Sequence, residues 1–298
     1  VEKIRKRMVE LNKETHWVPG FIGEKRFSNW LGNARDWAIS RNRYWGSCIP
    51  VWINIDDPDD KLCIGSVEEL KNLTGKEITD LHRHYLDDLI IEKEGKTYKR
   101  TSEVLDCWFE SGAMPYGQQH YPFENEELFK QGFPADFIAE GLDQTRGWFY
   151  TLTVLAVALF DSVAFKNCIT TGMILAEDGR KMSKSLKNYP DPEELLNEYG
   201  GDSLRAYLID SPVVRGEPLK FSEEGVKLVT RNIILPLWNS YSFFSTYANA
   251  DEITNEDLMK ALPVEERSLM DKWIISSLQS LIKTVNEKME NYYLRLKN

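Results

Sequence analysis

The pattern of apolar and polar residues predicts alternating strands and helices in the middle of the chain. Residues 134–140 predict a short buried strand, residues 145–160 a buried helix, and residues 167–175 a second strand. A strand, a helix and a second strand in this order form a right-handed parallel crossover. We therefore expect an α/β fold with a parallel sheet here.

The two ends of the chain show helical spacing instead. Ile4, Met8 and Leu11 predict a helix at the start, and the stretch 17–20 predicts its end. Beyond residue 225, apolar residues recur every three or four positions, which predicts the core-facing stripes of long antiparallel helices. The first stripe contains Val226, Val229, Ile233, Leu237, Tyr241 and Phe244, and the second contains Trp273, Ile274, Leu278, Leu281, Val285, Met289 and Tyr292.

Residues 47–100 have a different pattern, which predicts a small inserted subdomain. A strand at 49–53 leads into four aspartates within residues 56–60, and the segment 66–70 is typical of a capped helix start. The aspartates lack the spacing of a calcium loop, so an exposed turn is favoured over a metal site. His82 and His84 have no second pair of metal ligands nearby, which favours a hydrogen-bonding or surface role over zinc.

Composition and charge narrow the classes of protein. With 298 residues, of which 42% are hydrophobic, the chain can form two domains, or one large domain with an appended helical bundle. A net charge of −10 argues against a general nucleic-acid coat protein. Residues 1–45 nevertheless carry ten Lys or Arg against five Asp or Glu, which indicates either an anion-facing patch or an ordinary solvated helix face.

Cysteine usage and the distribution of apolar residues bear on the cellular location. Its four cysteines are scattered, a usage typical of a reducing compartment. No apolar run approaches the roughly 20 residues that span a bilayer, and the start does not have the pattern of a signal peptide. We predict a cytoplasmic protein without a membrane partner.

Candidate chemistry is concentrated in residues 179–188, which we call the lysine loop. Lys181 and Lys184 stand three apart, with Ser183 and Ser185 beside them, after an apolar run. Two ammonium groups on a glycine-preceded loop suit a nucleotide triphosphate, although short basic segments are also common as solvated surface loops. Residues 140–144 form a second polar group. Both follow predicted parallel strands, beyond whose carboxyl ends ligands bind, and this favours an active site.

A third segment of interest, residues 29–46, is dense in tryptophan and arginine. The tryptophans could pack in a core. Equally, arginines interleaved with aromatic residues fit a cleft that receives a phosphate-bearing ligand.

Taken together, these segments resemble the class I aminoacyl-tRNA synthetases, and within them the isoleucyl branch of eukaryotic or archaeal type. Lys181-Met182-Ser183-Lys184-Ser185 is similar to the KMSKS signature of the class. The resemblance runs from about Leu11 to the end of the chain. The segments that look like the isoleucyl branch are 33–46, 105–112 and 140–149.

The resemblance implies a specific domain organisation. The fold would be the C-terminal half of a Rossmann-like, parallel-sheet catalytic domain with a small insertion, followed by an α-helical bundle segment. Residues 1–46 would return from an editing insertion, 47–100 form the inserted subdomain, and 101–176 complete the catalytic domain. Residues 177–225 would hold the KMSKS loop and a stem-contact region, and 226–298 would begin a helical anticodon-binding domain.

The resemblance also implies an activity, in which isoleucine and ATP, the latter with Mg²⁺, form isoleucyl-adenylate, and the acyl group passes to tRNA(Ile). Lys181 and Lys184, with Ser183 and Ser185, would act on the transferring phosphates. Binding of the adenylate would involve Glu140, Gly141, Asp143 and Met182 on the nucleotide side and Gln144 at the amino-acid end. The walls of the side-chain pocket would be Trp108 and Trp148, and Arg41 and Arg43 would contact phosphate or tRNA.

The chain departs from the family pattern in several places. It contains no His-x-Gly-His element, since its histidines are His16, His82, His84 and His120. The resemblance places that element in a preceding half of the catalytic domain, so we expect a fragment that lacks its N-terminal half and is inactive alone. Residues 49–64 lack a cysteine cluster found in some relatives, so we expect no zinc or other protein-bound metal. Glu110 replaces an aspartate of the family.

The sequence also allows two alternative functions. A naturally truncated, non-catalytic tRNA-binding module would bind tRNA in a salt-dependent manner without affinity for adenylate. A valyl-type sister enzyme would share the catalytic class but differ in its side-chain pocket.

Overall fold

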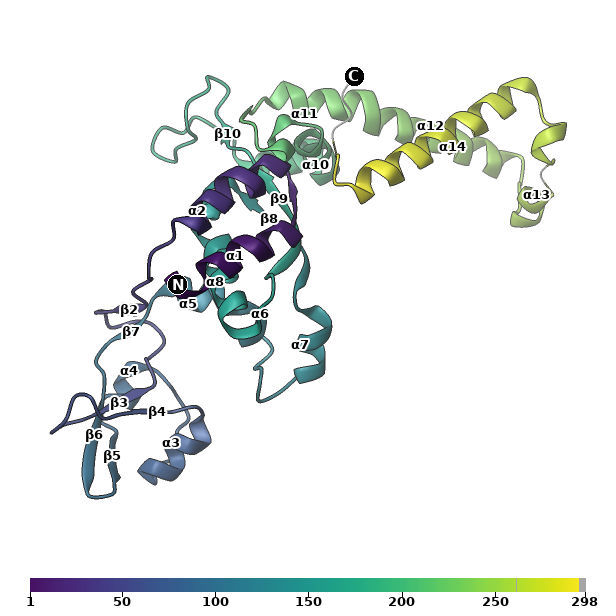
Figure 1. Ribbon diagram of the computed structural model, residues 1–298. Helices are drawn as coiled ribbons and strands as arrows, with labels where there is room; N and C mark the ends of the chain where they lie inside the picture. The colour runs from purple at the N-terminus through teal and green to yellow at the C-terminus, as the bar shows by residue number, and fades with distance from the viewer. Residues whose placement is uncertain (261, 295–298) are drawn as a thin grey trace. The chain divides into compact units, whose positions relative to one another are not determined.

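The computed structural model describes residues 1–260 and 262–294 (Figure 1). These residues form two compact units. The first unit contains Val1–His16, Gly23–Ile138 and Asp143–Asn167. The second contains Trp17–Ile22, Ala139–Leu142 and the chain from Cys168 onward. The chain therefore passes between the units several times.

A three-stranded sheet contains the strand–helix–strand segment. Its strands are hydrogen-bonded in the order β1 (His16–Val18), β9 (Phe165–Thr171) and β8 (Ala135–Gly141). A 3₁₀ helix, η4 (Leu142–Arg146), and then α8 (Trp148–Phe160) connect β8 to β9. The parallel sheet confirms the expected α/β fold.

Three details of this segment differ from expectation. Trp17 and Val18 do not simply end a helix; they form β1 and are buried. The strand β8 is half exposed, with Phe137 at 47%, because it lies at one end of the described strand order. The predicted strand 167–175 is divided at Gly172, whose N–H donates to the Val213 carbonyl.

Close backbone packing explains the division at Gly172. An ideal Cβ at this position would lie 1.9 Å from the carbonyl oxygen of Glu217, so only glycine fits. After this point β10 (Ile174–Leu175) pairs in parallel with β11 (Leu219–Lys220) in a separate two-stranded sheet.

Helix α8 is apolar on nearly all sides, and residues 151–157 are buried. It packs against α5 (Cys107–Gly112), where an ideal Cβ on Gly112 would lie 3.1 Å from the backbone of Thr151. The remaining elements of the first unit around it are short. They are η1 (Glu2–Ile4), α1 (Arg5–Leu11), η2 (Asn12–Glu14), the π-helical turn η3 (Ile22–Phe27, whose first residue belongs to the second unit), α2 (Ser28–Gly32), α6 (Met114–Gly117) and α7 (Glu126–Gly132).

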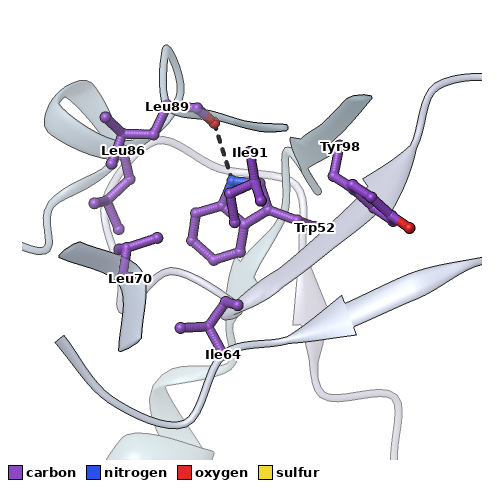
Figure 2. Close-up of a cluster of buried hydrophobic side chains, with 7 residues drawn as sticks. All are labelled: Trp52, Ile64, Leu70, Leu86, Leu89, Ile91 and Tyr98. Atoms are coloured by element: carbon purple, nitrogen blue, oxygen red, sulfur yellow. Dashed lines mark hydrogen bonds between the residues drawn. The ribbon is translucent and has the colours of Figure 1, made fainter. Parts of the chain in front are cut away.

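The small subdomain, residues 51–100, has its own antiparallel sheet and core. Its strand order is β4-β3-β6-β5. Trp52 is 1% exposed at the centre of the apolar cluster in Figure 2, and its indole N–H donates to the Leu89 carbonyl at 3.0 Å. The elements are β3 (Val51–Asn54), β4 (Lys61–Cys63), α3 (Val67–Thr74), α4 (Arg83–Leu86), β5 (Ile90–Lys93) and β6 (Lys96–Arg100).

Two local predictions within this subdomain are confirmed. The strand expected at 49–53 is β3, shifted by one or two residues. The helix start expected near residue 66 is capped by Ser66, whose hydroxyl accepts from the Glu69 N–H at 3.0 Å. On the chain entering and leaving the subdomain, β2 (Ser40–Arg41) pairs antiparallel with β7 (Val104–Leu105).

The second unit is largely helical beyond the sheet. A core of Leu195, Phe221 and Val226 lies among its first helices. These elements are α9 (Pro192–Tyr199), α10 (Gly201–Ile209), η5 (Pro212–Arg215) and α11 (Glu223–Val229).

The later helices confirm the predicted helical periodicity but not the predicted burial of the stripes. The π-helical turn η6 (Thr230–Ile234) continues into α12 (Leu235–Ala250). Then follow α13 (Asn255–Met259), η7 (Val264–Glu266) and α14 (Leu269–Glu290). Val226 is fully buried, and Val229 and Tyr292 are partly buried. The other residues of the stripes are exposed, with Tyr241 at 62% and Trp273 at 60%.

Within the described part of the chain, no helix combines the length and apolarity that crossing a membrane requires.

Candidate functional site

The backbone of the lysine loop is held by one asparagine. The Asn188 side chain accepts from the Ser183 N–H at 2.9 Å and donates to the Lys181 carbonyl at 3.2 Å. Before the loop, Leu175 forms an isolated β-bridge with Lys181, and the Ala176 N–H donates to the Arg180 carbonyl at 2.9 Å. The loop is therefore closed at both ends by hydrogen bonds.

The side chains of the lysine loop are left accessible by this backbone. Lys181 and Lys184 are exposed, and neither forms an ion pair with any residue that the structure describes. The hydroxyls of Ser183 and Ser185 lie 2.9 Å apart. Two exposed ammonium groups on a fixed backbone can reach the oxygens of a polyphosphate without first breaking an internal ion pair.

The residues around the two lysines are used differently. Met182 is partly buried against the core of Leu195, Phe221 and Val226, which anchors the loop. Arg180 donates to Asp178 at 2.7 Å, and the hydrogen bonds from its backbone and side chain lower the pKa of Asp178. The charge of Arg180 is thus locally neutralised.

Glu140 and Gly141 belong to the same unit as the lysine loop and end strand β8. Glu140 is exposed and Gly141 is half-buried. Their place at the carboxyl end of a parallel strand is where ligands bind in open α/β sheets. Asp143 and Gln144, which follow in η4, belong to the first unit.

In the first unit, Asp106 organises the start of α5. One of its oxygens accepts from the Trp108 N–H at 3.1 Å, which caps the helix. The other accepts from the Trp37 indole at 3.0 Å and from Arg41. Burial opposes ionisation of Asp106, but these hydrogen bonds and the Arg41 charge outweigh it and lower its pKa.

Trp108, Gln144 and Trp148 come together around Gly147. The Gln144 side-chain oxygen accepts from the Trp148 N–H at 2.9 Å, and the Trp148 indole donates to the Ser111 carbonyl at 2.9 Å. An ideal Cβ on Gly147 would lie 2.7 Å from the Gln144 oxygen and 3.2 Å from the Trp108 ring. The result is an apolar wall with an amide beside it, and Trp108 is 42% exposed there.

The remaining polar contacts in this region involve Asp143 and the two arginines. The Gln144 amide donates to Asp143 at 3.0 Å. Arg41 donates to Asp106 and to the Ala38 carbonyl, so its guanidinium already has internal partners. Arg43 is exposed and forms no ion pair among the described residues.

Three contributors were not assigned a role from the sequence: Asn188, Asp106 and Gly147. Asp106 could have been recognised as a helix N-cap, because it is an aspartate directly before an apolar helix start. For Asn188 and Gly147 the sequence carries no local signal, because their contacts depend on the fold of the loop and on the packing of Trp108.

Across the described residues, no group of three or more His, Cys, Asp or Glu side chains is placed to hold a metal ion.

Residues 1–220 match the family of class I tRNA synthetases (I, L, M and V), and the chain belongs to that family. Its relatives include the isoleucine–tRNA ligase of Protochlamydia amoebophila, 58% identical over 99% of this chain. The cytoplasmic isoleucine–tRNA ligase of Saccharomyces cerevisiae is 55% identical over the same share. The chain spans 28% of the length of each.

Solved structures of the class share the fold. The LeuRS of Agrobacterium radiobacter K84, in a ternary complex with tRNA and LeuAMS, matches 87% of this chain and 34% of its own, with a TM-score of 0.64 and 21% identity. The methionyl-tRNA synthetase of Mycobacterium tuberculosis, in complex with methionyl-adenylate, matches 97% of this chain and 47% of its own, with a TM-score of 0.63 and 18% identity.

Proposed function

We propose that this chain is the part of an isoleucine–tRNA ligase that contributes the lysine loop and the isoleucine pocket. In the complete enzyme an isoleucine carboxylate oxygen attacks the α-phosphorus of ATP, and pyrophosphate leaves to give isoleucyl-adenylate. The acyl group then passes to a hydroxyl of tRNA(Ile). The relatives at 54–58% identity support isoleucine as the substrate.

The observation that supports the proposal most strongly is the arrangement of the lysine loop. Its backbone is fixed by Asn188, while Lys181 and Lys184 stay exposed and unpaired within the described structure. Charge that develops on the transferring phosphates is best stabilised by cations that need no rearrangement. We assign this role to the two lysines, with Ser183 and Ser185 as hydroxyl donors and Mg²⁺ entering with ATP.

The other candidate residues receive roles from their places in the two units. Glu140, Gly141 and Asp143 hold the adenylate ribose, with Met182 contributing to nucleotide binding from its anchored position. Gln144 holds the amino-acid end, and Trp108 and Trp148 form flat walls for a branched alkyl side chain. Arg43 contacts phosphate. Arg41, which also donates to Asp106, contributes a second phosphate contact.

We further propose that the 298-residue chain does not form adenylate alone, because it contains no His-x-Gly-His element. The missing groups come from another half of the catalytic domain. Residues 226–298, of which 261 and 295–298 lie outside the described residues, begin the anticodon-binding domain. A cytoplasmic location agrees with the name of the yeast relative.

A chimera tests this assignment. The matching segment of the Protochlamydia amoebophila ligase is replaced by this chain, and isoleucine-dependent ATP–pyrophosphate exchange is measured. We expect activity from the chimera and none from the 298-residue chain. Exchange driven by valine in preference to isoleucine, or robust exchange by the chain alone, would contradict the proposal.

Variants of the active chimera test the individual roles. Lys184→Ala should lower the exchange rate by roughly 10²- to 10³-fold, the effect of losing one transition-state contact. Lys227→Ala, an exposed lysine on α11, is the matched control and should leave the rate unchanged. Equal rates for the two variants would exclude the role given to Lys184.

The isoleucine pocket is tested by Gly147→Ala. The added methyl group would press on Gln144 and Trp108 and displace the amino-acid end of the pocket. We expect kcat/KM for isoleucine to fall by up to about 10²-fold, as for a misplacement of about 1 Å, while the KM for ATP stays constant. A change confined to ATP would place Gly147 outside the isoleucine pocket.

A further inference from the structure

A cavity of about 910 Å³ opens within the first unit, and no residue assigned to adenylate formation lines it. It lies between the small subdomain and the segments that flank it in sequence. Its volume falls in the range of sites for small organic ligands. Among its lining residues are Trp45, Asp80, His82, Glu110 and Phe123.

Trp45 and His82, which line this cavity, belong to a group of five exposed rings in mutual contact. We call this group the aromatic cluster; its members are Tyr44, Trp45, His82, His84 and Tyr85. The Trp45 ring is 65% exposed, and its centroid lies 5.4 Å from Tyr44 and 5.7 Å from His82. His84 and Tyr85 follow at 4.2 Å. Exposed rings grouped in this way offer flat faces on which a further planar group can stack.

The backbone fixes Trp45 at the cavity. Residues 40–41 pair with 104–105, and Cys48 forms a bridge with Val104, so the segment between them must turn sharply. Gly46 makes this turn at φ 145°, where an ideal Cβ would lie only 2.9 Å from the Val104 side chain. The glycine thus allows the segment to lie against Val104 while the neighbouring indole stays outside.

His82 is also held in place. One oxygen of Asp80 accepts from both the backbone N–H and the ring Nδ1 of His82, at 2.7 and 2.6 Å. The backbone hydrogen bond is the main cause of the lowered pKa of Asp80, so this carboxylate is ionised at neutral pH. The ring stands nearly perpendicular to Trp45, at 84°.

Two carboxylates line the cavity with hydrogen-bonding capacity to spare. Glu110 accepts from the Ser47 N–H through one oxygen, at 2.6 Å, and Asp80 uses one oxygen for His82. The second oxygen of each accepts no hydrogen bond from the residues that the structure describes. Such acceptors repel a phosphate but match the exocyclic amino group of a base, as in carboxylate recognition of cytosine N4.

Positive charge is present beside the aromatic cluster. The Arg83 guanidinium lies 5.9 Å from the centroid of the Tyr44 ring and donates to the Arg43 carbonyl. Arg83 is paired with Asp87, whereas Arg43 is exposed and has no ion pair within the described residues. The arrangement thus combines amino-group acceptors in the cavity, stacking surfaces that begin at its lining residues Trp45 and His82, and cations near those surfaces.

We propose that this cavity binds an unpaired nucleobase with an exocyclic amino group, cytosine above all, stacked on Trp45 with its amino group donating to Asp80 or Glu110. The attached phosphate then lies toward Arg43. The base can come from a free nucleotide or from a single-stranded segment of RNA. Apart from Arg43, this site shares no residue with the adenylate chemistry proposed above.

The proposal is tested by measuring the affinity of the 298-residue chain for fluorescently labelled tetracytidylate by fluorescence anisotropy. Trp45→Ala should weaken binding roughly 5- to 150-fold, the range for one lost stacking contact. Trp45→Phe, which keeps a flat ring, should stay near the parent affinity. Trp238→Ala, a tryptophan of α12 with a similar exposure of 63%, is the matched control and should bind as the parent does.

The role of the carboxylates is tested with tetrauridylate, whose base lacks the amino group. Asp80→Asn should lower the preference for tetracytidylate over tetrauridylate while uridylate binding changes little. Asp88→Asn, in an exposed position nearby in sequence, should keep the preference. Unchanged circular dichroism of all variants will show that the fold is retained.

A comparison with cytidine monophosphate distinguishes the two sources of the base. Equal affinity for the nucleotide and the oligomer supports a free nucleotide, and binding of the oligomer alone supports RNA. Equal binding by Trp45→Ala and Trp238→Ala, or no binding of either probe at millimolar concentration, overturns the proposal. The binding assay involves no adenylate formation, so a failure of the proposed catalytic function is seen separately, in the ATP–pyrophosphate exchange of the chimera.

Discussion

The small subdomain and the two long helices α12 and α14 both contain many large apolar residues, but they bury them differently. In the subdomain Trp52 and Ile91 are almost completely inaccessible to solvent. In α12 and α14 no residue is buried, and Leu278 and Leu281 are more than half exposed. An apolar pattern therefore identifies residues that can be buried, while burial itself depends on a facing surface.

The difference in burial arises from where the packing surface for each element comes from. In the subdomain β3 and β4 pair as one hairpin and β5 and β6 as another, and the pairing of β3 with β6 joins the two hairpins. Leu70 of α3 then packs into the same apolar cluster. A single amphipathic helix satisfies its backbone internally but can bury its stripe only against another element. The subdomain supplies its own facing surface locally, and the helices do not.

The strongest test of this comparison is Trp52→Ala. Removing a fully buried indole should destabilise the subdomain by about 3–5 kcal/mol. Hydrogen exchange of the amides in residues 51–100 measures this loss. Trp238→Ala, on the exposed face of α12, should change the stability by less than about 0.5 kcal/mol. Similar effects of the two variants would remove the distinction between the regions.

A smaller effect is expected from Asp87→Asn. Asp87 accepts from Arg83 at 2.7 Å and from Arg100, which is 5% exposed. Burial raises the pKa of Asp87, but the two arginines outweigh it and lower the pKa. The variant leaves a buried guanidinium beside a neutral amide, which should cost about 1–3 kcal/mol. The same exchange measurement checks it, with Asp88→Asn as the control that should show no loss.

A weaker, pH-dependent effect should come from Asp60. Hydrogen bonds from Lys96, Asn54 and Tyr98 lower its pKa from 3.8 to about 2. Since the pKa is depressed in the folded state, the stabilisation is complete above pH 3.8 and is lost as the pH falls through about 2.

Amide protection in β3 and β6, corrected for intrinsic exchange, should therefore fall as the pH is lowered from about 4 to about 2. Asp60→Asn should remove the part of this pH dependence that comes from residue 60. An unchanged profile in the variant would show that the three hydrogen bonds to Asp60 do not stabilise the subdomain.

The smallest effect is expected from Leu278→Ala in α14. Leu278 is 51% exposed, so the variant should change the stability of the helix by no more than about 0.5 kcal/mol. Circular dichroism during thermal unfolding measures it, with Leu70→Ala in α3, which is 3% exposed, as the buried counterpart. A loss of 2 kcal/mol or more at Leu278 would mean that the stripe of α14 is covered in solution.

The candidate site shows the same division between local and tertiary information. The Lys181–Ser185 motif and the segment 140–144 were recognisable because their chemistry is written in consecutive residues. Asn188 could not be recognised in this way, since its role is to bond two backbone groups that only the folded loop brings to it. Trp108 and Trp148 were expected to share a pocket, but Gly147 as the point around which they meet is a result of packing.

The sequence by itself determined the types of the main elements, the capped start at Ser66 and the residues that mark the family. These depend on local spacing and on side chains adjacent along the chain. Only the tertiary structure decided that Trp17 and Val18 form a strand, that Gly172 divides a predicted one, and that the stripes of α12 and α14 face solvent. Each of these features depends on the free energy of contacts between residues that are distant in sequence. A local pattern of apolar and polar residues does not say which distant residues will meet.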